Sequence, residues 1–405
     1  MRILILAGWY PNNNNPMKGI FIREQARALA AAGLSVAVFY PFDEEIASKQ
    51  VEVSQEQGFT VFRANTYGQG NRYLARFLSY HTAQKKLQEV VGKFHPELIH
   101  VHVGYPAGII AYLFTRSHRI PYVITEHMSY LKDYVEKWQH RILLRPAFEQ
   151  AARVLPVSSS LAEQIKGFGW EVKLQPVPNV VDTDRFKCGN SSSGADSDLL
   201  LNSSRTLDLG SSAINDQINL LFVGNMEETQ VKGLQFLLPA FAKVLAEFKG
   251  KSPQNSSGRK LHLHCVGDGP KRADYEKLAG DLGVKESCTF YGRVSPDHMP
   301  EFYQRADLLV VSSLKETFGC VLIEAMASGK PVVATACGGP KDILQPEVGV
   351  LVEPGSTEEL VQGIKQVIST LESYNPEVIR HYAEDKYSPQ AIAKTLSAIY
   401  EEILA

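Results

Sequence analysis

The stretch Ser313-Leu-Lys-Glu-Thr-Phe-Gly-Cys-Val-Leu-Ile-Glu-Ala-Met-Ala-Ser-Gly329 says most about how this chain folds. It follows the strand-like run Asp307-Leu-Leu-Val-Val-Ser312 and contains a helix-forming segment, residues 321–327. A strand, loop and helix in this order place Glu316 on the loop at the carboxyl end of the strand. Free backbone N–H groups and the dipole make a helix start a site for anions. The pattern therefore predicts an anion site between two carboxylates, Glu316 and Glu324.

Length and composition exclude several classes of protein. A chain of 405 residues is too long for one ordinary core, so two domains are expected. A hydrophobic fraction of 44% and a net charge of −2 fit a globular protein without attraction to nucleic acid. The 5 cysteines are scattered, which favours a reducing, cytoplasmic compartment. We expect no signal peptide at the start, and no apolar run is long enough to span a membrane.

Short apolar runs alternate with helical stretches along the chain. In the first half the strand-like runs are residues 3–7, 35–40, 98–103, 122–125 and 154–157. In the second half they are residues 220–224, 261–266, 288–291, 308–312 and 331–334. Helical periodicity lies between them, as in residues 22–32 and 234–248. The alternation predicts an α/β protein with two doubly wound parallel sheets, and ligands at the carboxyl ends of the strands.

Composition marks the boundary between the two domains. Residues 188–217 are rich in Ser, Asn, Asp and Gly and have too few apolar residues to pack, so we expect a flexible linker or insertion. A smaller loop of the same kind is expected at residues 251–258. The predicted organisation is a first domain at 1–184, a linker at 185–218, a second domain at 219–385 and a final helix at 386–405.

A series of short motifs follows the same order along the chain. In the first half these are Gly8-Trp-Tyr-Pro11, Gly19-Ile-Phe-Ile-Arg-Glu-Gln25, Thr125-Glu-His127 and Pro178-Asn-Val-Val-Asp182. In the second half they are Phe222-Val-Gly-Asn225, Lys232-Gly233, Val266-Gly-Asp-Gly-Pro270, the Glu316 to Glu324 segment, Gly338-Gly-Pro340 and Gly349-Val-Leu-Val-Glu-Pro-Gly355. Together they resemble the family 4 glycosyltransferases of GT-B fold, and the first two resemble its bacterial exopolysaccharide and teichuronic-acid branch. The resemblance implies two Rossmann-like domains facing across a cleft, with the last helix crossing back to the first domain.

The resemblance also implies a reaction. A hexose would pass from a nucleoside-diphosphate sugar to an acceptor hydroxyl with retained configuration, without metal or cofactor, and with the leaving phosphate as base. Glu316 would hold the hydroxyls of the transferred sugar and Glu324 those of the ribose. The other donor-binding residues would be Gly19, Asn225, Lys232, Arg293, Phe318, Gly319, Cys320 and Val321.

One departure from the family concerns the phosphate corner. In the family a lysine, here Lys232, neutralises the diphosphate beside an arginine that directly follows the strand glycine. Asn225 takes the place of that arginine and can donate a hydrogen bond but brings no charge. We therefore expect weaker phosphate neutralisation here. Arg293 lies on a loop that the family uses near the nucleoside, and either a base or phosphate contact or a surface role is open.

Histidines supply the remaining candidates. The resemblance implies that His127 contacts the donor sugar or positions the acceptor, as a catalytic residue with Glu316 and Lys232. His100 and His102 are expected to point to opposite faces of their strand, with structural roles or places at the cleft rim. The Asp182-Thr-Asp184 run has the form of a metal-binding D-x-D, but it lies in the interdomain loop, so no metal site is predicted.

The resemblance also implies the partners of this chain. We expect a nucleotide-sugar donor and a saccharide or lipid-linked acceptor. The basic, partly amphipathic helix at residues 72–87 is either an ordinary domain helix or a peripheral contact with the inner face of the membrane. Two other functions remain open, a sugar-nucleotide 2-epimerase of the same fold and a catalytically decayed scaffold subunit of a polysaccharide assembly.

Overall fold

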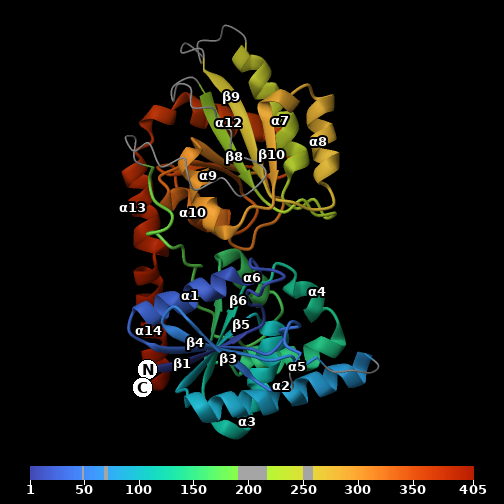
Figure 1. The fold of residues 1–405 in the computed structure, drawn as a ribbon, viewed down its shortest axis with the longest axis vertical. Helices are drawn as coiled ribbons and strands as arrows, with labels where there is room; N and C mark the ends of the chain where they lie inside the picture. The colour runs from blue at the N-terminus through green and yellow to red at the C-terminus, as the bar shows by residue number, and fades with distance from the viewer. Residues whose placement is uncertain (48–49, 68–71, 190–216, 250–258) are drawn as a thin grey trace.

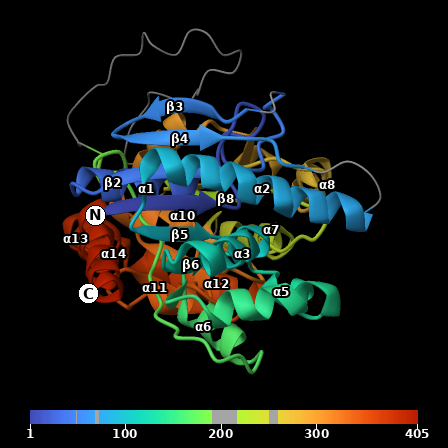
Figure 2. The same cartoon turned by 90° about the horizontal axis from the view of Figure 1, so that it is seen from below.

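The protein consists of two lobes, each built on its own sheet (Figure 1). The computed structural model describes residues 1–47, 50–67, 72–189, 217–249 and 259–405. Both termini lie on the first lobe, and the C-terminal helices run down one side from the second lobe to the first (Figures 1 and 2). The predicted α/β class with two doubly wound domains is confirmed.

The first lobe has a 7-stranded sheet in the order β3-β4-β2-β1-β5-β6-β7. Neighbouring strands are parallel except β3 and β4. The strands are β1 (Arg2–Ala7), β2 (Ser35–Tyr40), β3 (Glu52–Glu56), β4 (Phe59–Arg63), β5 (Leu98–His102), β6 (Tyr122–Glu126) and β7 (Arg153–Pro156). The helices are α1 (Ile20–Ala31), α2 (Arg72–Phe94), α3 (Ile109–His118), α4 (Leu131–Val135), α5 (Trp138–Glu149) and α6 (Ser159–Lys166).

The second lobe has a 6-stranded sheet, parallel throughout, in the order β10-β9-β8-β11-β12-β13. The strands are β8 (Gln217–Val223), β9 (Lys260–Val266), β10 (Cys288–Gly292), β11 (Leu308–Val311), β12 (Val332–Thr335) and β13 (Gly349–Val352). The helices are α7 (Leu234–Lys249), α8 (Arg272–Asp281), α9 (Met299–Arg305), α10 (Cys320–Ala327), α11 (Pro340–Ile343) and α12 (Thr357–Ser369), followed by α13 (Pro376–Tyr387) and α14 (Pro389–Leu404). Its central strands β8 and β11 are neighbours, so the loops after them meet at one edge.

The strands read as apolar runs because helices cover both faces of the sheets. One apolar core fills the first lobe and continues across α10, α13 and α14 to one face of the second sheet. A second core lies on the other face, between the sheet and helices α7, α8 and α12. The lobes are therefore joined by buried apolar side chains as well as by the chain itself.

The last helix returns to the first lobe. Ser388 caps α14 by accepting the Ala391 amide, and Pro389 occupies its first turn, where a missing N–H costs nothing. The buried face of α14 packs along α1, and Tyr400 Oη lies 2.6 Å from His100 Nδ1 on β5. The C-terminal segment therefore links the second lobe to the first along one side of the molecule (Figure 1).

One polar contact between the lobes involves a helix terminus. The carboxylate of Asp342, on α11 of the second lobe, accepts the Ser159 amide at 2.6 Å and also the Ser159 hydroxyl. Ser159 is the first residue of α6 in the first lobe. An acidic group at a helix N-terminus satisfies an amide that has no partner within the helix.

Some sequence predictions fall outside the described residues. Most of the predicted linker, residues 190–216, and the loop at 251–258 belong to this group. The predicted basic helix is α2, in which Lys86 and Lys93 both pair with Glu89. Among the helices within the described ranges, none combines the length and the apolar character needed to cross a bilayer.

Candidate active site

Glu316 lies on the loop between β11 and α10, at the carboxyl edge of the second sheet. Its Oε1 atom accepts hydrogen bonds from Lys232 Nζ at 2.5 Å and from Ser313 Oγ at 2.8 Å. The main chain is also held, since the Glu316 amide donates to the Cys337 carbonyl and the Gly339 amide donates to the Glu316 carbonyl. The side chain is 11% exposed, so the carboxylate is positioned before any ligand arrives. The loops after β8, β11 and β12 thus converge on this residue.

Two glycines allow the convergence. Gly233 has φ +73°, and a Cβ there would lie 1.8 Å from the Ser312 carbonyl oxygen, so only glycine brings the β8 loop this close to β11. Gly319 has φ +101° and starts α10. The amides that follow, those of Cys320 and Val321, have no acceptor within their own helix and can bind an anion.

Glu324 lies one turn into α10. Its Oε2 atom accepts a hydrogen bond from Tyr303 Oη at 2.6 Å, and its other oxygen can accept from a ligand hydroxyl. Burial raises the pKa of Glu324, while the Tyr303 hydrogen bond and the charge of Arg185 oppose the rise and the charge of Glu24 adds to it. Because Glu24 is on α1, this side of α10 faces the first lobe.

In the described part of the second lobe, the other three predicted residues form no side-chain hydrogen bond with either of these carboxylates. Asn225 is exposed after β8 and donates to Glu227 at 3.4 Å. Arg293 is exposed after β10, which β9 and β8 separate from β11. Phe318 is buried, with its ring 6.0 Å from that of Tyr387, so its side chain belongs to the core.

Gly19 and His127 both lie at the carboxyl edge of the first sheet. Gly19 starts α1 in the left-handed region, and a Cβ on it would lie 2.6 Å from the Trp9 carbonyl oxygen. His127 follows β6, its ring is 4.2 Å from that of Phe21, and its side chain is largely buried. His127 Nε2 lies 3.0 Å from His102 Nδ1, a partner that the motif alone does not reveal.

The expectation that His100 and His102 point to opposite faces of their strand was wrong. Side chains alternate along a strand, so residues two apart share a face. Their ring centroids are 4.3 Å apart. His100 bonds to Tyr400 and Thr125, whereas His102 bonds to His127, so of the two histidines it is His102 that contacts a predicted site residue.

Acid should destabilise the fold through these buried histidines. Burial lowers the pKa of His100 and His127 to about 3, so the folded chain keeps them neutral while the unfolded chain binds protons below about pH 6.5. The free energy of unfolding should therefore fall as pH drops through this range, by at most about 1.4 kcal/mol per pH unit for each histidine. Glu126 opposes part of the loss, because burial raises its pKa to about 7 and its folded form takes up a proton in the same range.

Urea unfolding near neutrality and about two pH units lower measures this loss. The variant His100→Asn should lose less stability on acidification than the parent protein. His381→Asn is the matched control, since His381 is 73% exposed, and it should behave as the parent does. Equal stability at both pH values would contradict the assignment of neutral buried rings.

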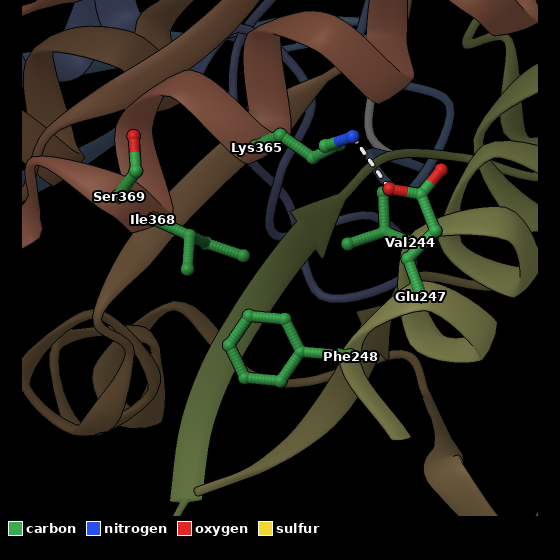
Figure 3. A pocket seen from close by; sticks show the side chains of 6 residues that line it. All are labelled: Val244, Glu247, Phe248, Lys365, Ile368 and Ser369. Carbon is green, nitrogen blue, oxygen red and sulfur yellow. Dashed lines mark hydrogen bonds and ion pairs between the residues drawn. The ribbon is translucent and has the colours of Figure 1, made fainter. Parts of the chain in front are cut away.

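Two hollows lie away from Glu316. The hollow between α7 and α12 is lined by Val244, Phe248 and Ile368 and closed by an ion pair between Lys365 and Glu247 (Figure 3). It has room for about 10 Å³, no more than one water molecule. A larger hollow of about 720 Å³ lies between the lobes beside Ser159 and Asp342, and of the predicted site residues it includes Phe318 alone.

Two family models match the chain, one in each lobe. Residues 19–185 match the model described as "Glycosyltransferase Family 4", and residues 205–385 match the model described as "Glycosyl transferases group 1". A Bacillus subtilis relative named "Putative teichuronic acid biosynthesis glycosyltransferase TuaC" is 26% identical over 90% of this chain and 88% of its own length. An uncharacterised glycosyltransferase of Methanocaldococcus jannaschii is 32% identical over 46% of this chain, and the match spans 45% of that relative.

Solved structures agree on the fold. Sucrose-phosphate synthase from Thermosynechococcus elongatus has a TM-score of 0.74 at 20% identity and covers 100% of this chain and 99% of its own. Anabaena HepE in complex with UDP and glucose has a TM-score of 0.69 at 18% identity and covers 99% of this chain and 100% of its own. The motifs, the two parallel sheets and both family models lead to one conclusion: the chain belongs to the family 4 glycosyltransferases of GT-B fold.

Proposed function

We propose that this chain transfers a hexose from a nucleoside-diphosphate sugar to an acceptor hydroxyl, with retained configuration and without a metal. The observation that carries the proposal is the bonded pair of Lys232 and Glu316 beside the start of α10. One corner of the lobe thus offers an ammonium, helix amides and a fixed carboxylate. A diphosphate needs the first two, and the hydroxyls of the transferred sugar need the third.

Donor binding rearranges this pair. The diphosphate takes over Lys232, and Glu316 then accepts hydrogen bonds from the sugar while Ser313 continues to hold it. Glu324, oriented by Tyr303, accepts the ribose hydroxyls. The complex of HepE with UDP and glucose supports such a ligand in a protein of the same fold.

Stabilisation of the leaving diphosphate is the main catalytic contribution. Charge grows on the phosphate oxygens as the sugar departs, so cations and amides placed there bind the transition state more tightly than the donor. Lys232 and the α10 amides supply the compensating positive charge and N–H donors in place of a metal ion. The leaving phosphate accepts the proton of the acceptor hydroxyl, so attack occurs on the same face and the configuration is retained.

Thermal melting against UDP, GDP, ADP and their sugar conjugates tests the donor. One nucleotide series should raise the melting temperature, since a ligand at about a hundredfold excess over Kd stabilises a protein by about 2.7 kcal/mol. The same sugar nucleotide should be slowly hydrolysed, with undiminished rate in a metal chelator and with retention at the anomeric carbon by NMR. Interconversion of two sugar nucleotides would instead indicate an epimerase, and binding without turnover a scaffold subunit.

A further inference from the structure

Aromatic rings gather at the carboxyl edge of the first sheet, on the lobe opposite Glu316. Trp9 follows β1 and Tyr130 follows β6, and their ring centroids are 6.4 Å apart. Phe21, two residues after Gly19, lies 6.4 Å from Trp9 and 4.2 Å from His127. Tyr130 is 41% exposed and Trp9 is half-buried, so the aromatic cluster of Trp9, Phe21, His127 and Tyr130 presents ring surface to solvent.

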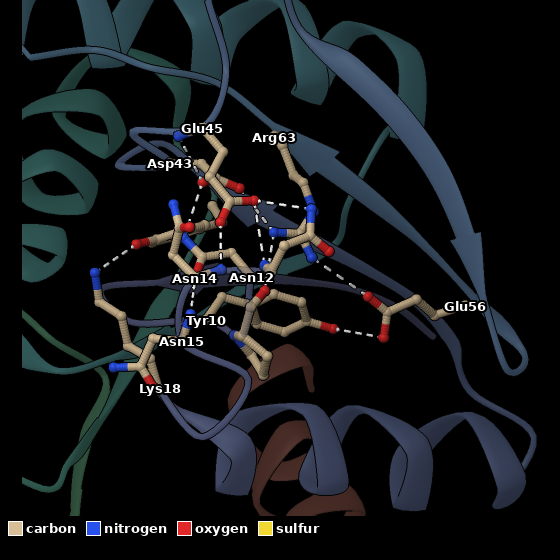
Figure 4. A network of polar contacts seen from close by, with 12 residues as sticks. Tyr10, Asn12, Asn14, Asn15, Lys18, Asp43, Glu45, Glu56 and Arg63 are labelled. Atoms are coloured by element: carbon tan, nitrogen blue, oxygen red, sulfur yellow. Dashed lines mark hydrogen bonds and ion pairs between the residues drawn. The ribbon is translucent and has the colours of Figure 1, made fainter. Parts of the chain in front are cut away.

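The loop that carries Trp9 is held in place by polar contacts (Figure 4). Glu45 accepts the amides of Asn13 and Asn14 at 3.2 and 2.6 Å. Arg63 donates to the Pro11 carbonyl at 3.0 Å. At the other end of the loop, Gly19 packs against the backbone of Trp9. The indole therefore needs little ordering when a ligand arrives, and ordering is a main cost of binding.

The chemistry of this surface suits a saccharide. A pyranose ring has faces of C–H groups, which carry partial positive charge and lie favourably against the electron-rich face of an aromatic ring, and a rim of hydroxyls. The loop between Trp9 and Gly19 also carries polar side chains, those of Asn14, Asn15 and Lys18 (Figure 4). A lipid chain would require a continuous apolar surface, which this mixed one does not provide.

We infer that Trp9 and Tyr130 form a stacking subsite for a pyranose ring of the acceptor, so that the acceptor is a saccharide. The inference rests on the proposed function. The rings come from the first lobe, whereas the groups that fit the donor come from the second, so the two sugars meet from opposite lobes. The acceptor hydroxyl is thereby brought to the side of the cleft that carries His127.

Transfer and donor hydrolysis are measured together for the parent and the variants Trp9→Ala, Trp9→Phe and Tyr130→Ala. The acceptors are methyl pyranosides and disaccharides of gluco, galacto and manno configuration, with long-chain alcohols for comparison. Trp9→Ala and Tyr130→Ala should raise the acceptor KM and lower the ratio of transfer to hydrolysis at least about tenfold, whereas Trp9→Phe, which keeps a ring, should lose less. Trp138→Ala is the matched control, since Trp138 is 69% exposed on α5, and it should match the parent.

A fluorescence titration gives a second readout. The chain has 3 tryptophans, and Trp170 is buried, so in the Trp138→Phe background an accessible indole signal comes from Trp9. Saccharide should quench it, and Tyr130→Ala should weaken the titration. An unchanged acceptor KM in Trp9→Ala, preference for the long-chain alcohols, or no saccharide response in either assay would overturn the subsite. Absence of donor hydrolysis in the parent would instead refute the proposed function.

Discussion

Replacing Glu316 with alanine should reduce turnover by about 10²- to 10³-fold, the loss seen when one preorganised polar group is removed from a transition-state site. The carboxylate is held by Lys232 and Ser313 at a point where three loops converge. Donor hydrolysis and transfer at saturating donor measure the loss as kcat.

Folding should survive this change. Lys232 is 32% exposed, so the ammonium left behind is hydrated and the lost ion pair costs less than about 1 kcal/mol. Glu286→Gln is a suitable control, because Glu286 is exposed ahead of β10, at the opposite end of the sheet. A folded Glu316→Ala protein with parental turnover would remove Glu316 from the mechanism.

Replacing Lys232 with methionine should lower kcat/KM by about 10- to 10²-fold, which corresponds to the 1.5–3 kcal/mol of a hydrogen bond to a charged group. The effect should be large because Asn225 brings no second cation to this corner. It should also shrink when salt is raised, since added ions screen the attraction between lysine and diphosphate. Initial rates at two ionic strengths measure both quantities.

The two substitutions should not be additive. Lys232→Met leaves Glu316 without its partner beside an anionic donor, so part of the loss is repulsion by the carboxylate. The double variant Lys232→Met with Glu316→Ala should therefore lose less than the sum of the two single variants. Lys243→Met is the control, as Lys243 lies on helix α7, which follows the Lys232 loop, is 49% exposed and pairs with Glu358. Strict additivity would show that the two groups act separately.

Much of the fold could be predicted because buried parallel strands are continuous apolar runs. Three strands were missed, for two different reasons. In β3 the exposed sequence Glu-Val-Ser-Gln-Glu has no apolar side facing a core, and it forms a strand because β4 pairs with it in antiparallel register. The sequence of β4, Phe-Thr-Val-Phe-Arg, mixes apolar and polar residues, and β13 is an edge strand supported by β12. Pairing between distant segments is not visible in local sequence.

The candidate site could be predicted in part. The spacing of Glu316 and Glu324 follows from one loop and one helix, so it is local information. The bond between Lys232 and Glu316 is not, because it depends on β8 and β11 being neighbours and on Gly233 letting their loops touch. The link between His102 and His127 likewise depends on the pairing of β5 with β6. Sequence motifs predict these residues, whereas the order of strands in the sheets determines which of them are in contact.

A residue of the second lobe, Asp342, caps the N-terminus of helix α6 in the first lobe. If the two lobes move apart, Asp342 must withdraw from α6, and the loss of this contact should cost the first turn about 0.5–2 kcal/mol. Amide hydrogen exchange at Ser159 should therefore report how often the two lobes separate, although this residue lies on the lobe opposite Glu316.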